Sequence, residues 1–432
     1  MDELLKKQIT KYYKKKFKKQ HFIPEVSPVS VSGKVFDHNE FLTGVEAVLD
    51  GWWTEGHFAE EFEGKFSKFL GVRYVSLVNS GSSANLAAFS ALSSTALKER
   101  ALKPGDEVIT AATGFPTTVN PIILKNCTPV FLDCDIATRN ITFADVKKAL
   151  TKKTKAIMIA HTLGNPYELD KIAKFAKENN LWLIEDCCDA LGSRYDKKLV
   201  GTFGDIATFS FYPAHQITMG EGGAVVTNNP WLHRAIRQFR DWGRDCWCDP
   251  GKDNTCGRRF AWKMGDLPFG YDHKYTYSQI GYNLKLTDMQ AAIGVAQLEK
   301  LPRFIEKRKE NFKTLLKGLK KYEKYLILPQ WEKKADPCWF GFMIVIKDDA
   351  PFTRLDAVTY LESKKIVTRS LFSGNLIRHP AYKNVKYKQV GKLANSDKVM
   401  NNGFWVGVYP GITGEMMHYM ILQFRIFLSQ YE

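Results

Sequence analysis

The sequence predicts an α/β fold with a mostly parallel sheet, followed by a smaller α+β domain. Short apolar runs rich in β-branched and aromatic residues recur through about the first 300 residues, and segments long enough for helices separate them. Such runs are typical of strands that are buried on both faces of a parallel sheet. A chain of 432 residues also exceeds a single ordinary core and indicates two packed domains. The predicted strands are 74–78, 107–111, 129–133, 156–160, 182–186, 206–211 and 224–227.

The first domain is expected to end near residue 300, where a long helical pattern runs from Thr287 past Lys307. The sequence after it is richer in Lys and Tyr and contains shorter predicted strands, such as 339–345. The expected units are a large α/β domain at 1–300, which carries a cysteine-bearing loop near 241–275, and a small α+β domain at 301–432.

The composition is that of a globular protein, with 44% hydrophobic and 25% charged residues. The chain opens with the charged segment Met1-Asp2-Glu3, no basic and then apolar leader follows, and no run of about 18 apolar residues appears. We therefore expect no membrane contact and a cytoplasmic location.

The net charge of +16 is partly concentrated near the N-terminus. The lysines there are interleaved with Tyr12, Tyr13 and Phe17. Binding of nucleic acid needs a recognisable module as well as charge, and none is visible, so we interpret the run as a solvated amphipathic helix. A basic surface also favours a nucleotide diphosphate substrate and an acidic electron-transfer partner. The lysines are Lys11, Lys14, Lys15, Lys16, Lys18 and Lys19.

Three polar loops follow predicted strands, at the sheet edge where open α/β sheets place their ligands. The loop at 79–85 precedes a helix and offers backbone N–H groups and hydroxyls to a phosphate, although a Gly-Ser turn also caps ordinary helices. The loop at 185–190 carries Asp186, whose alternative role is a helix N-cap. The third loop carries His215, which in isolation would be expected to be a satisfied core residue.

The order and spacing of these loops, together with the segment 281–292, resemble the sugar aminotransferases of fold type I, also called the DegT family, over nearly the whole chain. The resemblance implies the aspartate aminotransferase-like fold of PLP-dependent transferases, with cofactor binding in the large domain. It also implies a homodimer, because Asn283 is expected to reach the cofactor phosphate of the neighbouring subunit. By resemblance, Asp186 pairs with the pyridine nitrogen, Phe115 stacks on the cofactor ring, and Gly81, Ser82 and Ser210 bind the phosphate.

His215 stands where the family's aminotransferases carry the lysine that holds PLP as a Schiff base. Histidine forms no stable imine, so we expect a free cofactor, as the amine PMP, with His215 as the catalytic group that transfers protons. Tyr212 is a second catalytic candidate that orients the base or protonates an intermediate, with a packing role as the alternative. Asp189 replaces a glutamine that is usual in the family, and we leave it out of the predicted site.

Eight cysteines in an intracellular chain indicate ligands or core residues rather than a disulfide framework. Cys127, Cys134 and Cys338 are predicted to fill the core, and the role of Cys187 stays open. The other four follow the pattern C-x57-C-x-C-x7-C. Four thiolates hold either a 2Fe-2S cluster or a structural zinc ion, and the spacing alone does not decide between them. These predicted metal ligands are Cys188, Cys246, Cys248 and Cys256.

The histidine and the cysteine pattern together resemble the iron-sulfur 3-dehydratases that act on CDP-4-keto-6-deoxyglucose. This resemblance implies PMP- and 2Fe-2S-dependent removal of the sugar's 3-hydroxyl, in 3,6-dideoxysugar biosynthesis for the lipopolysaccharide O-antigen. A separate flavin iron-sulfur reductase, or a ferredoxin, supplies two electrons. Cys188 lies two residues beyond Asp186, so the cluster is expected within electron-transfer distance of the cofactor.

The sequence leaves four alternative functions. A plain aminotransferase is disfavoured by the absent lysine, and a cluster-free PMP-dependent 3-dehydratase is the nearest rival, because it needs the histidine but not the four cysteines. A zinc-stabilised enzyme and a nucleic-acid-binding scaffold follow. The assignment of CDP as the nucleotide of the substrate rests on the resemblance alone.

Overall fold

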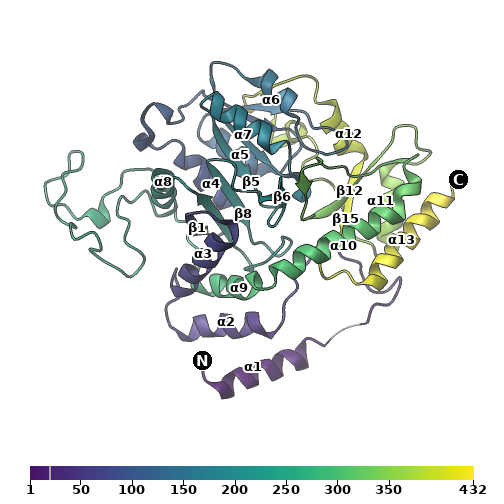
Figure 1. Ribbon diagram of the computed structural model, residues 1–432, viewed down its shortest axis with the longest axis horizontal. Coiled ribbons are helices and arrows are strands. Elements are labelled where there is room, and N and C mark those ends of the chain that lie inside the picture. The colour runs from purple at the N-terminus through teal and green to yellow at the C-terminus, as the bar shows by residue number, and fades with distance from the viewer. Residues whose placement is uncertain (19–20) are drawn as a thin grey trace.

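The computed structural model describes residues 1–18 and 21–432 and contains a large central sheet covered by helices on both faces (Figure 1). The order of its eight strands is β1-β9-β8-β5-β4-β2-β3-β14. The strands from β8 to β14 are parallel to one another, and β9 is antiparallel to its neighbours β1 and β8. The strands span β1 Tyr74–Val78, β2 Glu107–Ala111, β3 Thr128–Leu132, β4 Thr154–Ala160, β5 Trp182–Asp186, β8 Ile206–Ser210, β9 Gly223–Thr227 and β14 Lys388–Gln389.

The predicted α/β class and all seven predicted strands of this sheet are confirmed, with boundaries shifted by at most two residues. Every residue of β3, β5, β8 and β9 is buried, which explains their continuous apolar sequences. Neighbouring residues of a strand point to opposite faces of the sheet. Leu77 accordingly packs against α3 and α9, while Val78 packs against α4 and α8.

The helices that cover the sheet lie in two layers. The helices α4 and α8 lie against one face, and α3 and α9 lie against part of the other, where α6 and α7 continue the layer. Outside this layer, α2 packs on α9. The helices span α2 His38–Leu49, α3 His57–Leu70, α4 Gly81–Ala91, α5 Pro116–Leu124, α6 Phe143–Ala149, α7 Leu169–Glu178, α8 Pro230–Arg240 and α9 Asp288–Leu298.

The predicted long helix from Thr287 onward is two helices, α9 and α10 (Leu301–Leu319). Pro302, in the first turn of α10, has no N–H for the carbonyl four residues earlier, so α9 cannot continue through it. The second helix leads the chain from the large sheet toward a second core (Figure 1).

A second, four-stranded antiparallel sheet has the order β10-β12-β15-β13. Its apolar face packs against α10, α11 and α13. The predicted strand 339–345 is β12, at Gly341–Ile346. Strand pairings join this part to the rest of the chain: β14 pairs with β3 of the large sheet, β11 pairs with β6, and Val29 forms a bridge with Ile366. The remaining elements are β10 Leu326–Ile327, β13 Thr368–Arg369, β15 Gly403–Gly407, α11 Arg354–Ser363, α12 Ala394–Asn402, α13 Gly414–Ser429 and the small sheet of β6 Arg194–Tyr195, β7 Lys198–Leu199 and β11 Ala335–Asp336.

The basic N-terminal run lies on the helix α1 (Glu3–Lys16), which has no buried residue. Tyr13 contacts Phe36 and Phe41, so one edge of the helix is held by aromatic packing while its lysines face solvent. Lys18 follows the helix, and Lys19 lies outside the described residues. None of the helices in the described chain is both long and apolar enough to span a bilayer.

A long segment between α8 and α9 leaves the body of the molecule and returns to it (Figure 1). It has one short 3-10 turn, His273–Tyr275, and otherwise irregular structure. We call residues 241–286 the projecting segment. The other 3-10 turns are Thr95–Arg100, Thr162–Gly164, Lys320–Tyr322, Leu376–Arg378 and Pro380–Tyr382.

Candidate active site

A cavity of about 930 Å³ opens at the carboxyl ends of the parallel strands. The loops after β1, β2, β5 and β8 meet there, as the strand order requires. Seven residues of the predicted catalytic and cofactor-binding set line it, together with Cys188. The seven are Gly81, Ser82, Phe115, Asp186, Ser210, Tyr212 and His215.

The first turn of α4 forms an anion cradle at one end of this cavity. Ser80 caps the helix, with its Oγ accepting a hydrogen bond from the backbone N–H of Ser83 at 3.1 Å. Gly81 has no room for a side chain, because an added Cβ would lie 2.5 Å from the Cβ of Ser210. The glycine therefore lets β8 and its hydroxyl approach the positive end of the helix, where an anion is stabilised.

Asp186 ends β5 on the floor of the cavity and is 4% exposed. Its Oδ2 accepts hydrogen bonds from Asn85 Nδ2 at 2.8 Å and from Thr118 Oγ1 at 2.7 Å. Its Oδ1 accepts from the backbone N–H of Cys188 at 3.1 Å. Asn85 is fixed in turn, because its Oδ1 accepts from Thr208 Oγ1 at 2.7 Å. These donors hold the carboxylate in one orientation, as a partner for a ring nitrogen must be held.

His215 lies in the turn after β8, with its backbone N–H bonded to the carbonyl of Tyr212. Its Nδ1 is 3.7 Å from Asp189 Oδ1, and its ring centroid is 5.1 Å from that of Phe340. Burial, aided by the nearby Arg308 guanidinium, lowers the pKa of His215 to about 3. The imidazole is therefore neutral at physiological pH and is available as a base.

Asp189, which we left out of the predicted site, lines the same cavity and faces this imidazole. Burial, followed by repulsion from Asp186, raises the pKa of Asp189 to about 8. A protonated carboxyl group at this position can donate its O–H, but at 3.7 Å it makes no hydrogen bond to Nδ1 of His215, which has no partner among the described residues. Leaving Asp189 out of the predicted site was therefore wrong, because the residue lies beside His215 in the cavity. Its difference from the family's usual glutamine was the signal in the sequence.

Arg308 is a further residue that the sequence did not single out. It is fully buried on α10, and its Nη2 donates to the backbone carbonyl of His215 at 2.9 Å. Its Nη1 donates to the carbonyls of Trp339 and Phe340 at 3.1 and 3.3 Å. One guanidinium thus fixes both the turn that carries the histidine and the aromatic ring beside it. It lies on the predicted helical stretch past Lys307, where nothing in the local sequence indicates a contact with His215.

The two aromatic residues of the predicted site lie at the mouth of the cavity. Phe115 is 48% exposed and meets the ring of Phe372 edge-on at 5.6 Å. Tyr212 is 50% exposed, with its ring centroid 6.5 Å from that of His215. Neither side chain is packed away in the core, so both are accessible to a molecule in the cavity.

Asn283 does not line the cavity of its own chain. It lies at the base of the projecting segment, where it forms a bridge with Asp241, and its Oδ1 accepts from Lys285 Nζ at 2.8 Å. Its predicted contact with the phosphate of a neighbouring subunit concerns a second chain and stays a prediction.

The cysteines divide between three environments. Cys127, Cys134 and Cys338 are buried as predicted, and burial raises the pKa of their thiols to about 12, 11 and 12. Cys188 lines the main cavity. Cys246, Cys248 and Cys256 line a separate small cavity within the projecting segment, together with His273 and Lys274. The predicted gathering of four thiols is therefore absent from residues 1–18 and 21–432 of a single chain.

The three thiols of the projecting segment lie around one small cavity, but they do not form a compact ligand group. The backbone N–H of Cys248 approaches Cys246 Sγ at 3.5 Å, and Cys248 Sγ lies 3.0 Å from Thr255 Oγ1. Burial opposes ionisation of the Cys248 thiol, but hydrogen bonds from Thr255 outweigh it and lower the thiol's pKa. Burial raises the pKa of the neighbouring Cys246 thiol, and the three sulfur atoms do not all lie within 4.8 Å of one another, so the cavity on its own is not a formed metal site.

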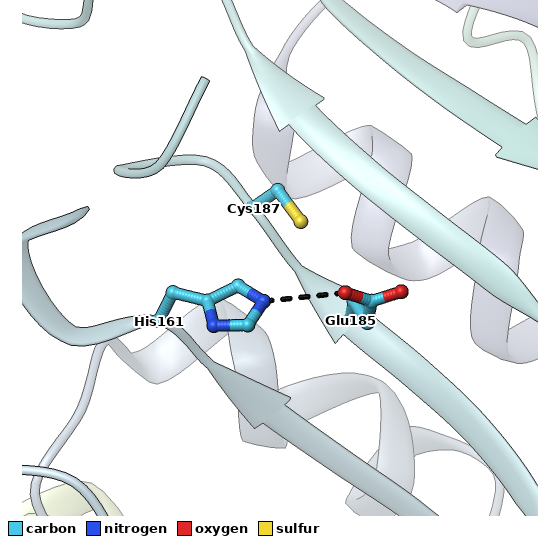
Figure 2. A group of neighbouring side chains, drawn as sticks. All are labelled: His161, Glu185 and Cys187. Carbon is cyan, nitrogen blue, oxygen red and sulfur yellow. Dashed lines mark hydrogen bonds and ion pairs between the residues drawn. The ribbon is translucent and has the colours of Figure 1, made fainter. Parts of the chain in front are cut away.

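Cys187, whose role the sequence left open, lies in a buried group with His161 and Glu185 (Figure 2). His161 Nε2 is 3.4 Å from Glu185 Oε2. The Glu185 carboxylate already accepts three backbone N–H groups at 2.6 to 2.8 Å, and burial raises the pKa of the Cys187 thiol well above its usual range. A saturated carboxylate and a protonated thiol are poor metal ligands, so this group braces the loop after β7. The three donors are Gly201, Phe203 and Gly204.

Comparison with known proteins agrees with this geometry. The lipopolysaccharide biosynthesis protein RfbH of Salmonella typhimurium is 54% identical over 427 residues, which cover 99% of this chain and 98% of that protein. The dTDP-4-dehydro-2,6-dideoxy-D-glucose 3-dehydratase of Saccharopolyspora spinosa is 51% identical over 95% of this chain and 88% of its own length. A solved structure of the E. coli GDP-4-keto-6-deoxy-D-mannose-3-dehydratase with bound hydrated PLP superposes with a TM-score of 0.82, at 31% identity, over 91% of this chain and 98% of that chain.

The expected fold type I architecture is confirmed by that superposition. The model of the DegT/DnrJ/EryC1/StrS aminotransferase family matches residues 36–425, which include the whole cavity apart from its edge at residues 31 and 32. The residues around the cavity, the fold and the extent of the match agree, and this chain belongs to the DegT/DnrJ/EryC1/StrS aminotransferase family, whose members are PLP-dependent enzymes of deoxysugar biosynthesis.

Proposed function

We propose that this protein is a PMP-dependent 3-dehydratase that removes the 3-hydroxyl of a nucleotide-linked 4-keto-6-deoxyhexose. One observation carries the proposal: His215 stands at the cavity where a lysine is needed to tether PLP, and no lysine is among the lining residues in the described part of the chain. Transfer of an amino group through a tethered cofactor depends on that lysine. Two of the relatives are named as 3-dehydratases, which supports the same reaction class for this protein.

The residues present fit a pyridoxal-type cofactor. The cradle of Gly81, Ser82 and Ser210 at the start of α4 would hold its phosphate, Asp186 would pair with its ring nitrogen, and Phe115 would cover its ring. When bound there, the cofactor supplies an electron sink that acidifies the carbon bearing its amine.

His215 would act as the base in this cavity. Its Nδ1 lies 3.7 Å from Asp189 and has no hydrogen-bond partner among the described residues, and we assign Nε2 as the nitrogen that would remove a proton from the cofactor's 4′ carbon. The resulting imidazolium is then placed to protonate the sugar's 3-hydroxyl as it departs as water. Arg308 keeps the turn at His215 in place during both transfers, and Tyr212 at the mouth would orient the sugar or assist the base.

The shape and charge of the cavity support a nucleotide-sugar substrate. Its volume of about 930 Å³ is at the upper end of the range of ligand pockets. Arg369, at the end of β13, is the one cationic side chain other than histidine among the lining residues of the described chain. We propose that it binds the diphosphate. The relatives' names specify dTDP or GDP, so our prediction of CDP is a finer proposal that substrate comparison must decide.

The iron-sulfur form of the enzyme is likewise a finer proposal. Its support is the cysteine pattern, three of whose thiols surround one small cavity, and a flavin iron-sulfur reductase or a ferredoxin is part of the same proposal. A cytoplasmic location, a homodimer and a domain boundary at residue 300 are separate predictions. The cluster-free alternative has its own support: one structure of the 30%-identical GDP-4-keto-6-deoxymannose-3-dehydratase holds a PLP-glutamate geminal diamine, which points to glutamate as the regenerating amine.

A single anaerobic experiment tests the proposal. The protein is incubated with PMP and with CDP-, dTDP- or GDP-linked 4-keto-6-deoxyhexose, and the 3-deoxygenated product and iron content are measured with a reductase, with glutamate, and with neither. We expect loss of the 3-hydroxyl with one preferred nucleotide. Transfer of an amino group to the sugar at C4 without dehydration would refute the proposal. Dehydration that turns over with glutamate in iron-free protein would establish the cluster-free form.

A further inference from the structure

A further cavity, of about 10 Å³, adjoins His215 and is distinct from the main cavity. The turn after β8 lines it with His215, Gln216 and Thr218, while α9 and α10 contribute Gln297 and Arg308. A cavity needs roughly this volume to hold one water molecule, which also needs about two to four polar partners. We call it the water-sized cavity, and its volume leaves no room for a larger ligand.

Three residues of the water-sized cavity each have a buried polar atom that has no hydrogen-bond partner in the described part of the chain. These atoms are Nδ1 of His215, Oε1 of Gln216 and Nε of Arg308. Gln216 is 2% exposed and Arg308 is fully buried, so bulk solvent does not satisfy either group. Buried polar atoms of proteins are nearly always paired with protein or with ordered water. The three atoms around one cavity therefore indicate a common partner.

The other polar atoms of Arg308 and Gln216 are already engaged, so neither side chain can turn to pair its free atom elsewhere. Both Nη atoms of Arg308 donate to backbone carbonyls, one of which belongs to His215. The Nε2 of Gln216 donates to the carbonyls of Asp189 and Cys338. Rotation of either side chain would break these bonds, and the free atoms are thus held in place.

Two more buried polar side chains line the water-sized cavity, and both have partners. The Oγ1 of Thr218 donates to the Phe211 carbonyl at 3.2 Å and accepts from the backbone N–H of Gly220 at 2.9 Å. The Oε1 of Gln297 accepts from the backbone N–H of Thr218 at 3.2 Å, and its Nε2 donates to the Val35 carbonyl at 2.8 Å. These side chains therefore do not compete for a molecule in the cavity.

The three unpaired atoms have the hydrogen-bonding character that suits a water molecule. The Nε–H of Arg308 can only donate, and Oε1 of Gln216 can only accept. A water molecule accepts the first bond, donates the second, and has capacity left for Nδ1 of His215. Asp189 does not serve this nitrogen directly, because its carboxyl oxygen is 3.7 Å away, beyond hydrogen-bond distance.

We propose that the water-sized cavity binds one water molecule, which accepts hydrogen bonds from Nε–H of Arg308 and Nδ1–H of His215 and donates one to Oε1 of Gln216. A neutral imidazole carries a single ring N–H, so this arrangement leaves Nε2 unprotonated, as the base in the main cavity requires. Gln216 is then a positioning residue that acts on His215 through the water. The choice of tautomer rests on the proposed function, whereas the water site does not.

Crystallography and NMR of the protein without PMP or substrate test the proposal. In a high-resolution electron-density map of the wild-type protein, we expect one water peak within hydrogen-bond distance of all three atoms. In protein with ¹⁵N-labelled histidine, the His215 signals, identified by their loss in His215→Asn, should show a proton on Nδ1 and none on Nε2. A map without this peak, or a neutral ring with its proton on Nε2, would overturn the proposal.

The variant Gln216→Met tests the positioning role, and Gln297→Met is a matched control at another glutamine of the same cavity. Without Oε1 of Gln216, a water that keeps Arg308 as its donor has Nδ1 of His215 as its remaining acceptor. Part of the His215 population should therefore shift to the tautomer with the proton on Nε2, and exchange of the 4′ hydrogen of PMP should slow by the same fraction. The control should keep the wild-type tautomer, and equal spectra of the two variants would overturn the role of Gln216.

These measurements also separate the water site from the proposed function. Wild-type protein that shows the water peak and the Nδ1 proton but does not remove the 3-hydroxyl of any nucleotide sugar would refute the dehydratase and keep the water site. Dehydration by a protein whose map lacks the water would do the reverse.

Discussion

Lowering the pH from 7 to 5 should leave the proton transfer by His215 almost unchanged. With a pKa of about 3, this imidazole stays neutral throughout that range. A histidine with an ordinary pKa near 6.5 would lose its basic form about 25-fold over the same two pH units. The groups that face it are Asp189, which is neutral below its pKa of about 8, the fixed charge of Arg308, and Asp186 deeper in the cavity.

The assay is exchange of the 4′ hydrogen of bound PMP with solvent deuterium, followed by mass spectrometry at saturating PMP and substrate, because exchange reports the first proton removal alone. Circular dichroism at each pH verifies that the protein remains folded. A decline of about 25-fold with a midpoint near pH 6.5 would refute the neutral, buried state of His215. A decline above pH 8 that disappears in Asp189→Asn would assign the upper limit to that carboxyl group.

Folding stability gives an independent test of the same pKa. The folded-state pKa of His215 lies below its unfolded value, so the unfolded chain binds more protons between pH 6.5 and 3. As the pH is lowered through that window, this one residue should therefore decrease the free energy of unfolding by up to about 1.4 kcal/mol per pH unit. The His215→Asn variant lacks this contribution, and equal pH slopes for the two proteins would contradict the assignment.

The remaining predictions concern the base, the thiols, the cradle and the buried arginine. His215→Asn should slow 4′-hydrogen exchange by about 10²- to 10⁴-fold while PMP binding, measured by titration, is retained; unchanged exchange would remove His215 from the reaction. Cys248→Ser should lose iron and visible absorbance but keep exchange, so loss of exchange would place this thiol in the first step. Gly81→Ala should destabilise the fold by about 1–3 kcal/mol and weaken PMP binding, because its Cβ overlaps Ser210. The control Gly64→Ala, with no atom within 4 Å of its new Cβ, should be neutral or stabilising, and equal effects of the two would contradict the cradle. Arg308→Met should reduce the free energy of unfolding by about 3–5 kcal/mol, because three carbonyls lose a charged donor. Denaturant titration measures this loss. A loss smaller than that of a variant at an exposed arginine would refute the structural role of Arg308.

Local sequence patterns were sufficient to predict the strands of the large sheet and most of the residues that line the main cavity. The strands of the large sheet are short apolar runs that must be buried on both faces, so their positions follow from the sequence alone. The loops at 79–85, 185–190 and 210–215 each follow such a strand, and parallel strands bring their carboxyl ends to one edge. Residues as distant as Gly81 and His215 could therefore be assigned to one cavity before the structure was known.

Contacts between distant segments could not be predicted in this way. Arg308 reaches the backbone of His215 from a helix 93 residues later, and Asp189 faces the imidazole because of the path of one loop. The resulting burial lowers the pKa of His215 and raises that of Asp189, and no spacing in the sequence encodes either shift. The cysteine pattern is the sharpest case, since its spacing predicted one site and the structure divides it between two cavities.

The sequence by itself determined the fold class, the chemistry offered at the strand ends and the absence of a lysine at position 215, because these depend on residue type and local periodicity. Tertiary structure alone decided which charges face one another, which thiols are neighbours and which apolar surface is left uncovered. Those properties depend on how segments that are far apart in the chain pack in space, and packing sets both the dielectric environment and the distance between groups.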